Sequence, residues 1–225
     1  MFGVFIVLEG PDGCGKGEQT RRLVERLEAL GQRVVQISFP QYGKKSAGLV
    51  EEYLNGKYGH NVGPHAASIF FAADRFDKAV EIRQLLAEGC VVVADRYVDS
   101  NAGHQGSKIS DDEERKRFLA WLYDLEYCKL GVPKPDRVLI LHVPARIGYG
   151  LVLQKQKRAY LEGGKKQDIH EADIRHLEAA EASYLWLARQ YPDEHVLIEC
   201  MDGERLLPPE EVSKRVWAEV KNLLE

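Results

Sequence analysis

Near the start of the chain, the stretch GPDGCGKGEQT (residues 10–20) holds three residues that together could bind phosphate. Gly10, Gly15 and Lys16 have the spacing G-x-x-x-x-G-K, between an apolar run and an amphipathic stretch. Glycines in this pattern let backbone N–H groups curl around phosphate oxygens, and the lysine reaches the outer phosphates. The pattern predicts a phosphate-binding loop, with a glycine-rich turn and an exposed lysine as the alternative. The loop residues are Gly10, Pro11, Asp12, Gly13, Cys14, Gly15, Lys16, Gly17 and Glu18.

The two residues after Lys16 depart from the usual form of such a loop. Gly17 stands where a serine or threonine commonly binds magnesium, and Glu18 places a carboxylate near the expected phosphates. Because magnesium keeps several waters and needs only one or two protein ligands, water can replace the missing hydroxyl. Glu18 also suits a helix N-terminus, with Arg22 four residues later as an ion-pair partner. We favour this ion pair, and direct metal binding by Glu18 is the alternative.

A second charged pair, Asp95 and Arg96, follows another apolar run. Open α/β folds bind their ligands at the carboxyl ends of the strands, where these residues would lie. An acid there can hold magnesium through water, and an arginine can bridge phosphates as charge shifts during phosphoryl transfer. The pair therefore indicates phosphoryl-transfer chemistry, with an ordinary surface ion pair as the alternative.

The stretch FFAADR (residues 70–75) places an aromatic ring and a guanidinium on one helix face. Phe71 and Arg75 are four residues apart, and no acidic residue stands three or four positions from Arg75. A stacking ring beside a planar set of donors suits a nucleobase. The opposite face carries an apolar stripe of the kind that packs on a core: Ile69, Ala73, Phe76 and Val80.

Five short apolar segments are the expected strands that position these residues. Most of them lack polar alternation, as strands buried on both faces do. Their residues are 4–9, 33–39, 91–96, 137–143 and 195–200. Helical patterns lie between them, including residues 64–88. This alternation predicts an α/β fold with a parallel sheet in a single domain, residues 1–225.

Two further helices and one loop are expected. Residues 17–30 carry Leu23, Leu27 and Leu30, and Gly31 follows as a helix end. Residues 171–191 have an apolar stripe of Leu177, Ala180, Tyr184, Leu187 and Tyr191. Residues 154–168 are polar and basic with two adjacent glycines, which indicates a mobile covering loop or merely a solvated charged one.

The composition excludes several classes of function. A formal charge of -4 argues against broad binding to nucleic acid. The four cysteines are scattered without a C-x-x-C pair, which argues against a zinc site or a disulfide framework. No basic segment precedes Lys16, and no apolar run approaches the ~18 residues that span a membrane. We therefore expect a cytoplasmic protein with no nucleic-acid or membrane partner.

Taken in order, the motifs resemble the thymidylate kinase family. They are FIVLEGPDGCGK, FPQY, FFAADR, DRYVDSNAGHQG, GVPKPDRVLIL and the D-x-x-E of Asp168 and Glu171. The resemblance implies the nucleoside monophosphate kinase fold, a five-stranded parallel sheet of order 2-3-1-4-5 flanked by helices, with a lid near residues 145–170. It also implies a homodimer packed through helices, and ATP-dependent phosphorylation of dTMP to dTDP with Mg²⁺.

The resemblance also implies roles for individual residues. Phe71 would stack on thymine, Arg75 would bond a base oxygen, and Tyr97 would disfavour a ribose 2′-hydroxyl. The acceptor site would comprise Asp12, Phe39, Pro40, Tyr42, Phe71, Arg75, Arg96, Tyr97, Asn101, His104 and Gln105. The catalytic residues would be Lys16, Arg96, Asp95, Asp12 and Arg158. Asp95 would help to hold the metal, and Lys157 is the second choice for the lid cation.

Four departures from the family pattern bear on these expectations. The family usually has two hydroxyl residues at Gly17 and Glu18, often tyrosine at His104, and in many members aspartate at His142; the fourth departure is a lysine-rich lid. Two alternative functions follow. One is a kinase for another nucleotide, such as dUMP, or for a nucleoside; the other is a nucleotide-binding protein with impaired catalysis.

Overall fold

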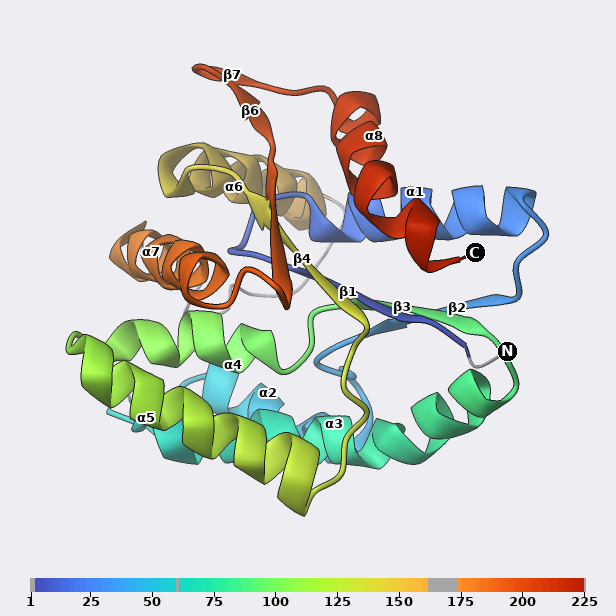
Figure 1. Cartoon of the computed structure of the whole chain (residues 1–225). Coiled ribbons are helices and arrows are strands. Elements are labelled where there is room, and N and C mark those ends of the chain that lie inside the picture. The colour runs from blue at the N-terminus through green and yellow to red at the C-terminus, as the bar shows by residue number, and fades with distance from the viewer. Residues whose placement is uncertain (1–2, 60, 162–173, 225) are drawn as a thin grey trace.

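The computed structural model describes residues 3–59, 61–161 and 174–224, and of residues 155–161 it describes the backbone alone. One parallel sheet has the strand order β2-β3-β1-β4-β5 (Figure 1), which confirms the expected order. The strands are β1 (Phe5–Glu9), β2 (Val34–Ser38), β3 (Val91–Asp95), β4 (Arg137–His142) and β5 (His195–Glu199). The strand that precedes the phosphate-binding loop thus lies at the centre of the sheet, beside β3 and its Asp95.

Helices connect the strands, as parallel pairing requires. They are α1 (Lys16–Ala29), α2 (Gly48–Leu54), α3 (Pro64–Ala87), α4 (Asp99–His104), α5 (Asp112–Tyr123), α6 (Ala145–Leu161), α7 (Ile174–Gln190) and α8 (Pro209–Val220). The shorter elements are η1 (Lys45–Ala47), η2 (Gly106–Lys108), the π-helical turn η3 (Asp124–Lys129), η4 (Lys221–Leu223) and a hairpin of β6 (Met201–Asp202) and β7 (Arg205–Leu206). No helix in the described ranges combines the length and apolar character needed to cross a membrane.

The sheet is covered on both faces, which explains the continuous apolar character of its strands. Phe5 and Val7 of β1 pack in a core with α3, α4, α5 and α7. Ile6 and Leu8 of the same strand pack in a second core with α1 and α8. Figure 1 shows these two helical layers on opposite sides of the sheet. Packing from both sides fixes the strand ends, and with them the loops that carry the site.

Three expectations about the helices and loops were wrong. The stripe of Ile69, Ala73, Phe76 and Val80 on α3 is exposed, because the opposite face, with Ala79 and Ile82, packs on the sheet. Both faces are apolar, so helical periodicity alone could not identify the buried one. Leu30 follows the end of α1 and is exposed. Residues 154–161 are helical rather than a loop, and the rest of the expected loop, 162–168, lies outside the described residues.

Candidate active site

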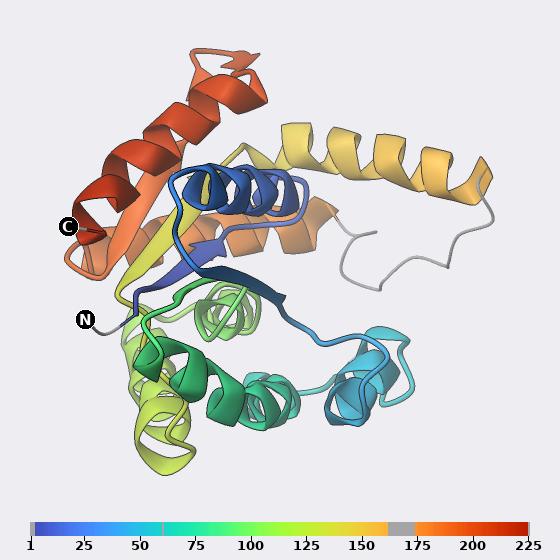
Figure 2. The same ribbon diagram turned by 90° about the vertical axis from the view of Figure 1, so that its right-hand side faces the viewer.

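A cleft of about 790 Å³ lies where β1, β2 and β3 end. Figure 2 shows α2 and α6 extending from the body on the side toward which β2 points, and Leu54 and Leu151 of these helices line the cleft. Asp95 and all eleven residues expected at the acceptor site line it too. From the loop, the lining residues are Asp12, Gly13, Gly15, Lys16, Gly17 and Glu18. A volume of this size is in the range of small-molecule sites.

The phosphate-binding loop forms as its glycines predict. Gly10, Gly13 and Gly15 all have positive φ, a conformation that side chains with a Cβ rarely adopt. The loop leads directly into α1, whose N-terminus faces the cleft with Lys16 as its first residue. Lys16 Nζ donates to the carbonyl oxygens of Gly10 at 3.0 Å and Pro11 at 2.9 Å. The carbonyl oxygens of the loop therefore hold the Lys16 ammonium group in place.

Three loop residues expected at the nucleotide do not line the cleft. Gly10 and Pro11 instead accept hydrogen bonds from Lys16, and the buried Cys14 sulfur lies 3.7 Å from the same ammonium. A Cβ on Gly10 would come within 2.5 Å of the Leu141 carbonyl oxygen. These three residues shape the loop and hold its lysine.

Gly17 and Asp95 lie side by side at the base of the loop. A Cβ built on Gly17 would lie 3.4 Å from Asp95 Oδ2, so a side chain there would stand against this carboxylate. Asp95 Oδ1 is buried and has no hydrogen-bond partner among the described groups. A buried carboxylate oxygen without a donor is costly, and a cation or its bound water would satisfy it. The residues present therefore fit a magnesium ion held mainly through water.

Glu18 forms the ion pair that its position predicts. Its carboxylate accepts from Arg22 Nε at 2.6 Å and from Arg21 Nη2 at 2.8 Å. Arg22 also binds Glu210 of α8. Hydrogen bonds from the two arginines keep the pKa of Glu18 below its ordinary value. The Glu18 carboxylate is therefore bound by two arginines on the surface of α1.

Arg96 reaches across the loop from the end of β3. Its backbone has φ 71°, in the left-handed region that is unfavourable for residues other than glycine. Its guanidinium forms an ion pair with Asp12 and donates from Nη1 to His104 Nε2 at 3.1 Å. Burial alone would raise the pKa of Asp12, but Arg96 and Lys16 outweigh it and lower that pKa. Opposite charges from the loop after β1 and from the residue after β3 thus pair in the lining of the cleft.

Glu9 is a buried carboxylate that the sequence analysis missed. It is the last residue of β1 and accepts hydrogen bonds from the Tyr97 backbone N–H at 2.7 Å and from the hydroxyls of Ser100 and Tyr184, each at 2.8 Å. Burial raises its pKa. Glu9 therefore fixes the turn from which Arg96 projects. An acidic residue that ends an apolar strand was the available signal.

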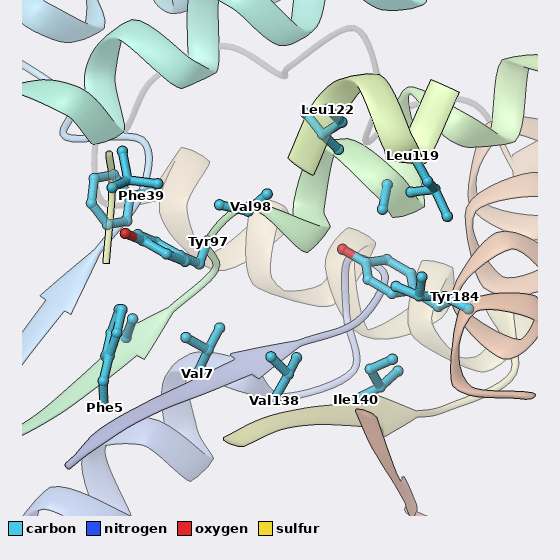
Figure 3. Close-up of a cluster of buried hydrophobic side chains, with 14 of the residues drawn as sticks. Phe5, Val7, Phe39, Tyr97, Val98, Leu119, Leu122, Val138, Ile140 and Tyr184 are labelled. Atoms are coloured by element: carbon cyan, nitrogen blue, oxygen red, sulfur yellow. The ribbon is translucent and has the colours of Figure 1, made fainter. Parts of the chain in front are cut away.

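Aromatic side chains build the wall at the far end of the cleft. Tyr97 packs between Phe5 and Phe39, with ring centroids 5.0 Å and 5.6 Å away (Figure 3). Phe39 and Tyr97 also line the cleft, so the wall is continuous with the core beneath it. Burial raises the pKa of the Tyr97 phenol, and its oxygen has no hydrogen-bond partner among the described groups.

Arg75 and Asn101 meet at a second carboxylate that the sequence analysis missed, Glu126 of η3. The sequence offers Arg75 no acidic partner within its own helix, and the structure pairs it outside that helix, in a bidentate ion pair with Glu126 at 2.6 Å and 2.5 Å. Arg75 is 1% exposed and Glu126 is fully buried. The partner is 51 residues away in the chain, so spacing within one helix could not find it. The signal was a glutamate in helical register with the apolar residues Phe118 and Leu122.

The two histidines that depart from the family pattern have different surroundings. His104 lines the cleft, and its Nδ1 lies 3.2 Å from His176 Nε2. His142 is outside the cleft lining and binds Glu181 at 2.9 Å and Glu199 at 2.7 Å. His104 therefore belongs to the site, whereas His142 joins the ends of β4 and β5 to α7.

The expected lid residues are described only in part. Arg158 and Lys157 lie in α6, but their side chains are outside the described part of the chain. Asp168 and Glu171 also lie outside it. Leu151 and Val152, earlier in α6, line the cleft.

Comparison with known proteins agrees with this arrangement. The family model for thymidylate kinase matches residues 8–198. A thymidylate kinase of Mycobacterium tuberculosis (strain ATCC 25618 / H37Rv) is 32% identical over 83% of this chain and 86% of its own length. One from Caulobacter vibrioides is 34% identical over 88% of each chain. The human thymidylate kinase is 35% identical over 63% of this chain and 61% of its own length.

A solved structure supports the fold. The structure of thymidylate kinase from Candida albicans superimposes with a TM-score of 0.70, covers 99% of this chain and 92% of its own, and is 21% identical. The family match spans the phosphate-binding loop, Asp95 and Arg96, and the cleft-lining rings of Phe39 and Tyr97. This chain belongs to the thymidylate kinase family.

Proposed function

We propose that this chain transfers the γ-phosphoryl group of ATP to dTMP, giving dTDP and ADP. One observation carries the proposal: a single cleft joins a phosphate-binding loop to an aromatic pocket with buried hydrogen-bonding groups. The charged pair of Asp12 and Arg96 lies between the two ends, where the reacting phosphates would meet. The match to relatives named thymidylate kinase supports this acceptor over the other nucleotides and over an impaired enzyme.

The proposed mechanism depends on position and charge. The phosphate of dTMP is already a nucleophile, so its oxygen can attack the γ-phosphorus without a general base. Lys16 would leave its loop carbonyls and bind the outer phosphates of ATP, while Arg96 would contact the phosphate in transfer. Asp12 would hold Arg96 in place until the acceptor binds.

We propose Mg²⁺ as the metal cofactor, bound beside Asp95. The buried, unpartnered Asp95 Oδ1 supports this site. The ion would neutralise charge on the ATP phosphates. Because Gly17 has no hydroxyl, more of its ligands would be water than in a loop with serine or threonine.

We propose that residues 145–170 form a lid that excludes water, with Arg158, or else Lys157, as its phosphate contact. Leu151 and Val152, in the first part of this segment, line the cleft, and this position supports the proposed lid.

We further propose a homodimer that packs through α3. Three large apolar side chains on its outer face, Ile69, Phe76 and Val80, are 49%, 51% and 54% exposed. An aligned apolar stripe on a surface helix is typical of an interface. A cytoplasmic location is part of the same proposal, and four free cysteines support it.

An acceptor panel tests the proposed specificity. ADP release is measured with ATP and each of dTMP, dUMP, AMP, CMP, GMP and thymidine. We expect the highest kcat/KM with dTMP, because the pocket holds a stacking ring and base-directed polar groups. A better acceptor elsewhere in the panel would refute the proposed specificity.

A further inference from the structure

A charged residue, Glu126, lies buried in the protein interior directly after helix α5. Phe118, Leu119 and Leu122 of α5 are buried in the core below the sheet. Glu126 follows four residues after Leu122, in the π-helical turn η3, where Leu130 N–H donates to the Leu125 carbonyl at 2.9 Å. π-helical turns are rare and frequently lie at functional sites. A fully buried carboxylate in this turn requires donors, and it receives them from two residues that line the cleft.

The first donor is Arg75, whose guanidinium has five N–H groups. Glu126 accepts from Nε at 2.6 Å and from Nη2 at 2.5 Å, and the Tyr97 carbonyl accepts from Nη1 at 3.1 Å. One N–H on Nη1 and one on Nη2 therefore remain. Since Arg75 lines the cleft and never accepts a hydrogen bond, it presents donors to the ligand.

The second donor is Asn101 of α4. Its Nδ2 lies 3.1 Å from the Ser68 carbonyl oxygen and 3.4 Å from Glu126 Oε1. Both neighbours can only accept, so the amide must turn its nitrogen toward them. Both amide hydrogens are then directed away from the ligand, and the oxygen of Asn101 is the group left for the cleft, which this residue lines. The Ser68 carbonyl and the carboxylate at position 126 therefore together fix which way the amide points.

We infer that Glu126 is a positioning residue that sets the hydrogen-bonding polarity of the base pocket, and that it selects 4-oxo over 4-amino pyrimidines. This inference rests on the proposed function. A donor from Arg75 beside an acceptor from Asn101 matches the O4 and N3–H of thymine. Cytosine has a 4-amino group and an unprotonated N3, which reverse both partners. Gln105 also lines the cleft, and its buried Oε1 has no hydrogen-bond partner among the described groups.

The test replaces Glu126 by glutamine, which keeps its size but offers one acceptor and one donor. The acceptors are dTMP and 5-methyl-dCMP, which differ only at position 4 and in the N3 proton. For Glu126→Gln we expect KM for dTMP to rise on the order of 10-fold, because Arg75 and Asn101 lose their fixed orientations. The kcat/KM ratio of dTMP to 5-methyl-dCMP should fall by a similar factor, while KM for ATP stays unchanged.

Asp124→Asn is the matched control. It removes a charge from the same turn, but Asp124 is exposed and pairs with Lys129 on the surface. The KM for dTMP and the kcat/KM ratio of dTMP to 5-methyl-dCMP should therefore stay as in wild type. A folded Glu126→Gln protein with unchanged dTMP KM and unchanged ratio would overturn the inference. Equal rises in KM for dTMP and ATP with the ratio unchanged would do the same, since they indicate a merely structural role.

A second variant decides the matter if Glu126→Gln does not fold. Glu126→Asp keeps a carboxylate as the acceptor for Arg75 and Asn101 but on a shorter side chain. The KM for dTMP should therefore rise while the preference for dTMP over 5-methyl-dCMP remains. An unchanged KM, or a lost preference, would overturn the inference. A wild-type protein that forms no dTDP would be a failure of the proposed function, whereas a wild-type protein that forms dTDP but does not prefer dTMP to 5-methyl-dCMP would overturn the inference.

Discussion

Individual side chains in the cleft are held by partners from distant parts of the chain. Lys16 is held by its own loop, but Arg96 depends on Asp12, 84 residues earlier, and its backbone turn depends on Glu9. Motif spacing can predict the first kind of contact, because loop and lysine are neighbours in sequence. It cannot predict the second kind, which exists only once the strands are paired.

Replacing Arg96 by alanine should lower kcat by on the order of 10²-fold or more, because it removes charge-assisted contacts to the reacting phosphates. Steady-state turnover at saturating ATP and dTMP measures this. Arg33→Ala, at an exposed pair with Glu88, serves as the control and should leave turnover unchanged. An Arg96→Ala enzyme with full turnover would exclude the proposed role.

Replacing Glu18 by threonine should leave the fold intact and retain activity. The carboxylate is engaged by Arg21 and Arg22 on the helix surface, so its loss removes exposed ion pairs of small value. Turnover and its dependence on magnesium concentration are the measurements. Complete inactivation with normal folding would instead identify Glu18 as a metal ligand.

At the scale of elements, the strands were the most predictable part. The five apolar segments became the five strands, and the central strands β1, β3 and β4, which are buried on both faces, carry the clearest apolar runs. The outward face of α3 was misassigned, since Ile69, Phe76 and Val80 satisfy the same periodicity as a buried stripe. The turn η3 could not be foreseen either, because a π-helical turn has no simple sequence pattern.

The ends of α4 and β5 are joined by a buried ion pair whose strength should depend on pH. His195 Nε2 lies 3.2 Å from Asp99 Oδ2, and both side chains are almost fully buried. Burial alone would lower the pKa of His195, but Asp99 outweighs burial and raises it above the ordinary 6.5. The stabilisation is therefore complete below about pH 6.5 and is lost as pH rises through the raised pKa.

We expect His195→Gln to lower the free energy of unfolding by about 3 kcal/mol near pH 6, since it leaves Asp99 without its charged partner. The loss should be smaller at about pH 9, because His195 gives up its proton as pH rises through its raised pKa. Urea unfolding at both pH values measures this. An equal loss at both would show that His195 is not charged in the folded protein.

At the scale of the whole molecule, α3 has two roles. Its inner face packs on the sheet and supplies Arg75 to the cleft, while its outer face presents Phe76 and Val80. We expect Phe76→Asp to convert a dimer into monomers, as a charge in an apolar interface would. Sedimentation velocity measures this, with Leu30→Asp as the control, because Leu30 is equally exposed but follows α1 on the other face of the sheet. A dimeric Phe76→Asp protein would contradict packing through α3.

The resemblance to the family predicted the sheet order and many of the residues that line the cleft. Gly10, Pro11 and Cys14 were expected there and do not line it, whereas five lining residues were not expected: Ser38, Leu54, Ser100, Leu151 and Val152. The resemblance did not predict the carboxylates that hold the lining residues. Glu9 and Glu126 are buried charges that gain their donors only in the folded chain, from residues 25 or more positions away. Such contacts are a property of the whole fold and not of any local pattern.

The central claim is that this cleft transfers a phosphoryl group from ATP to dTMP. The most direct measurement separates the products of a reaction with ATP, dTMP and magnesium by chromatography. We expect dTDP and ADP in equal amounts, with almost no ADP when dTMP is omitted. Nucleotide binding without dTDP, or ADP formed without dTMP at the same rate, would contradict it.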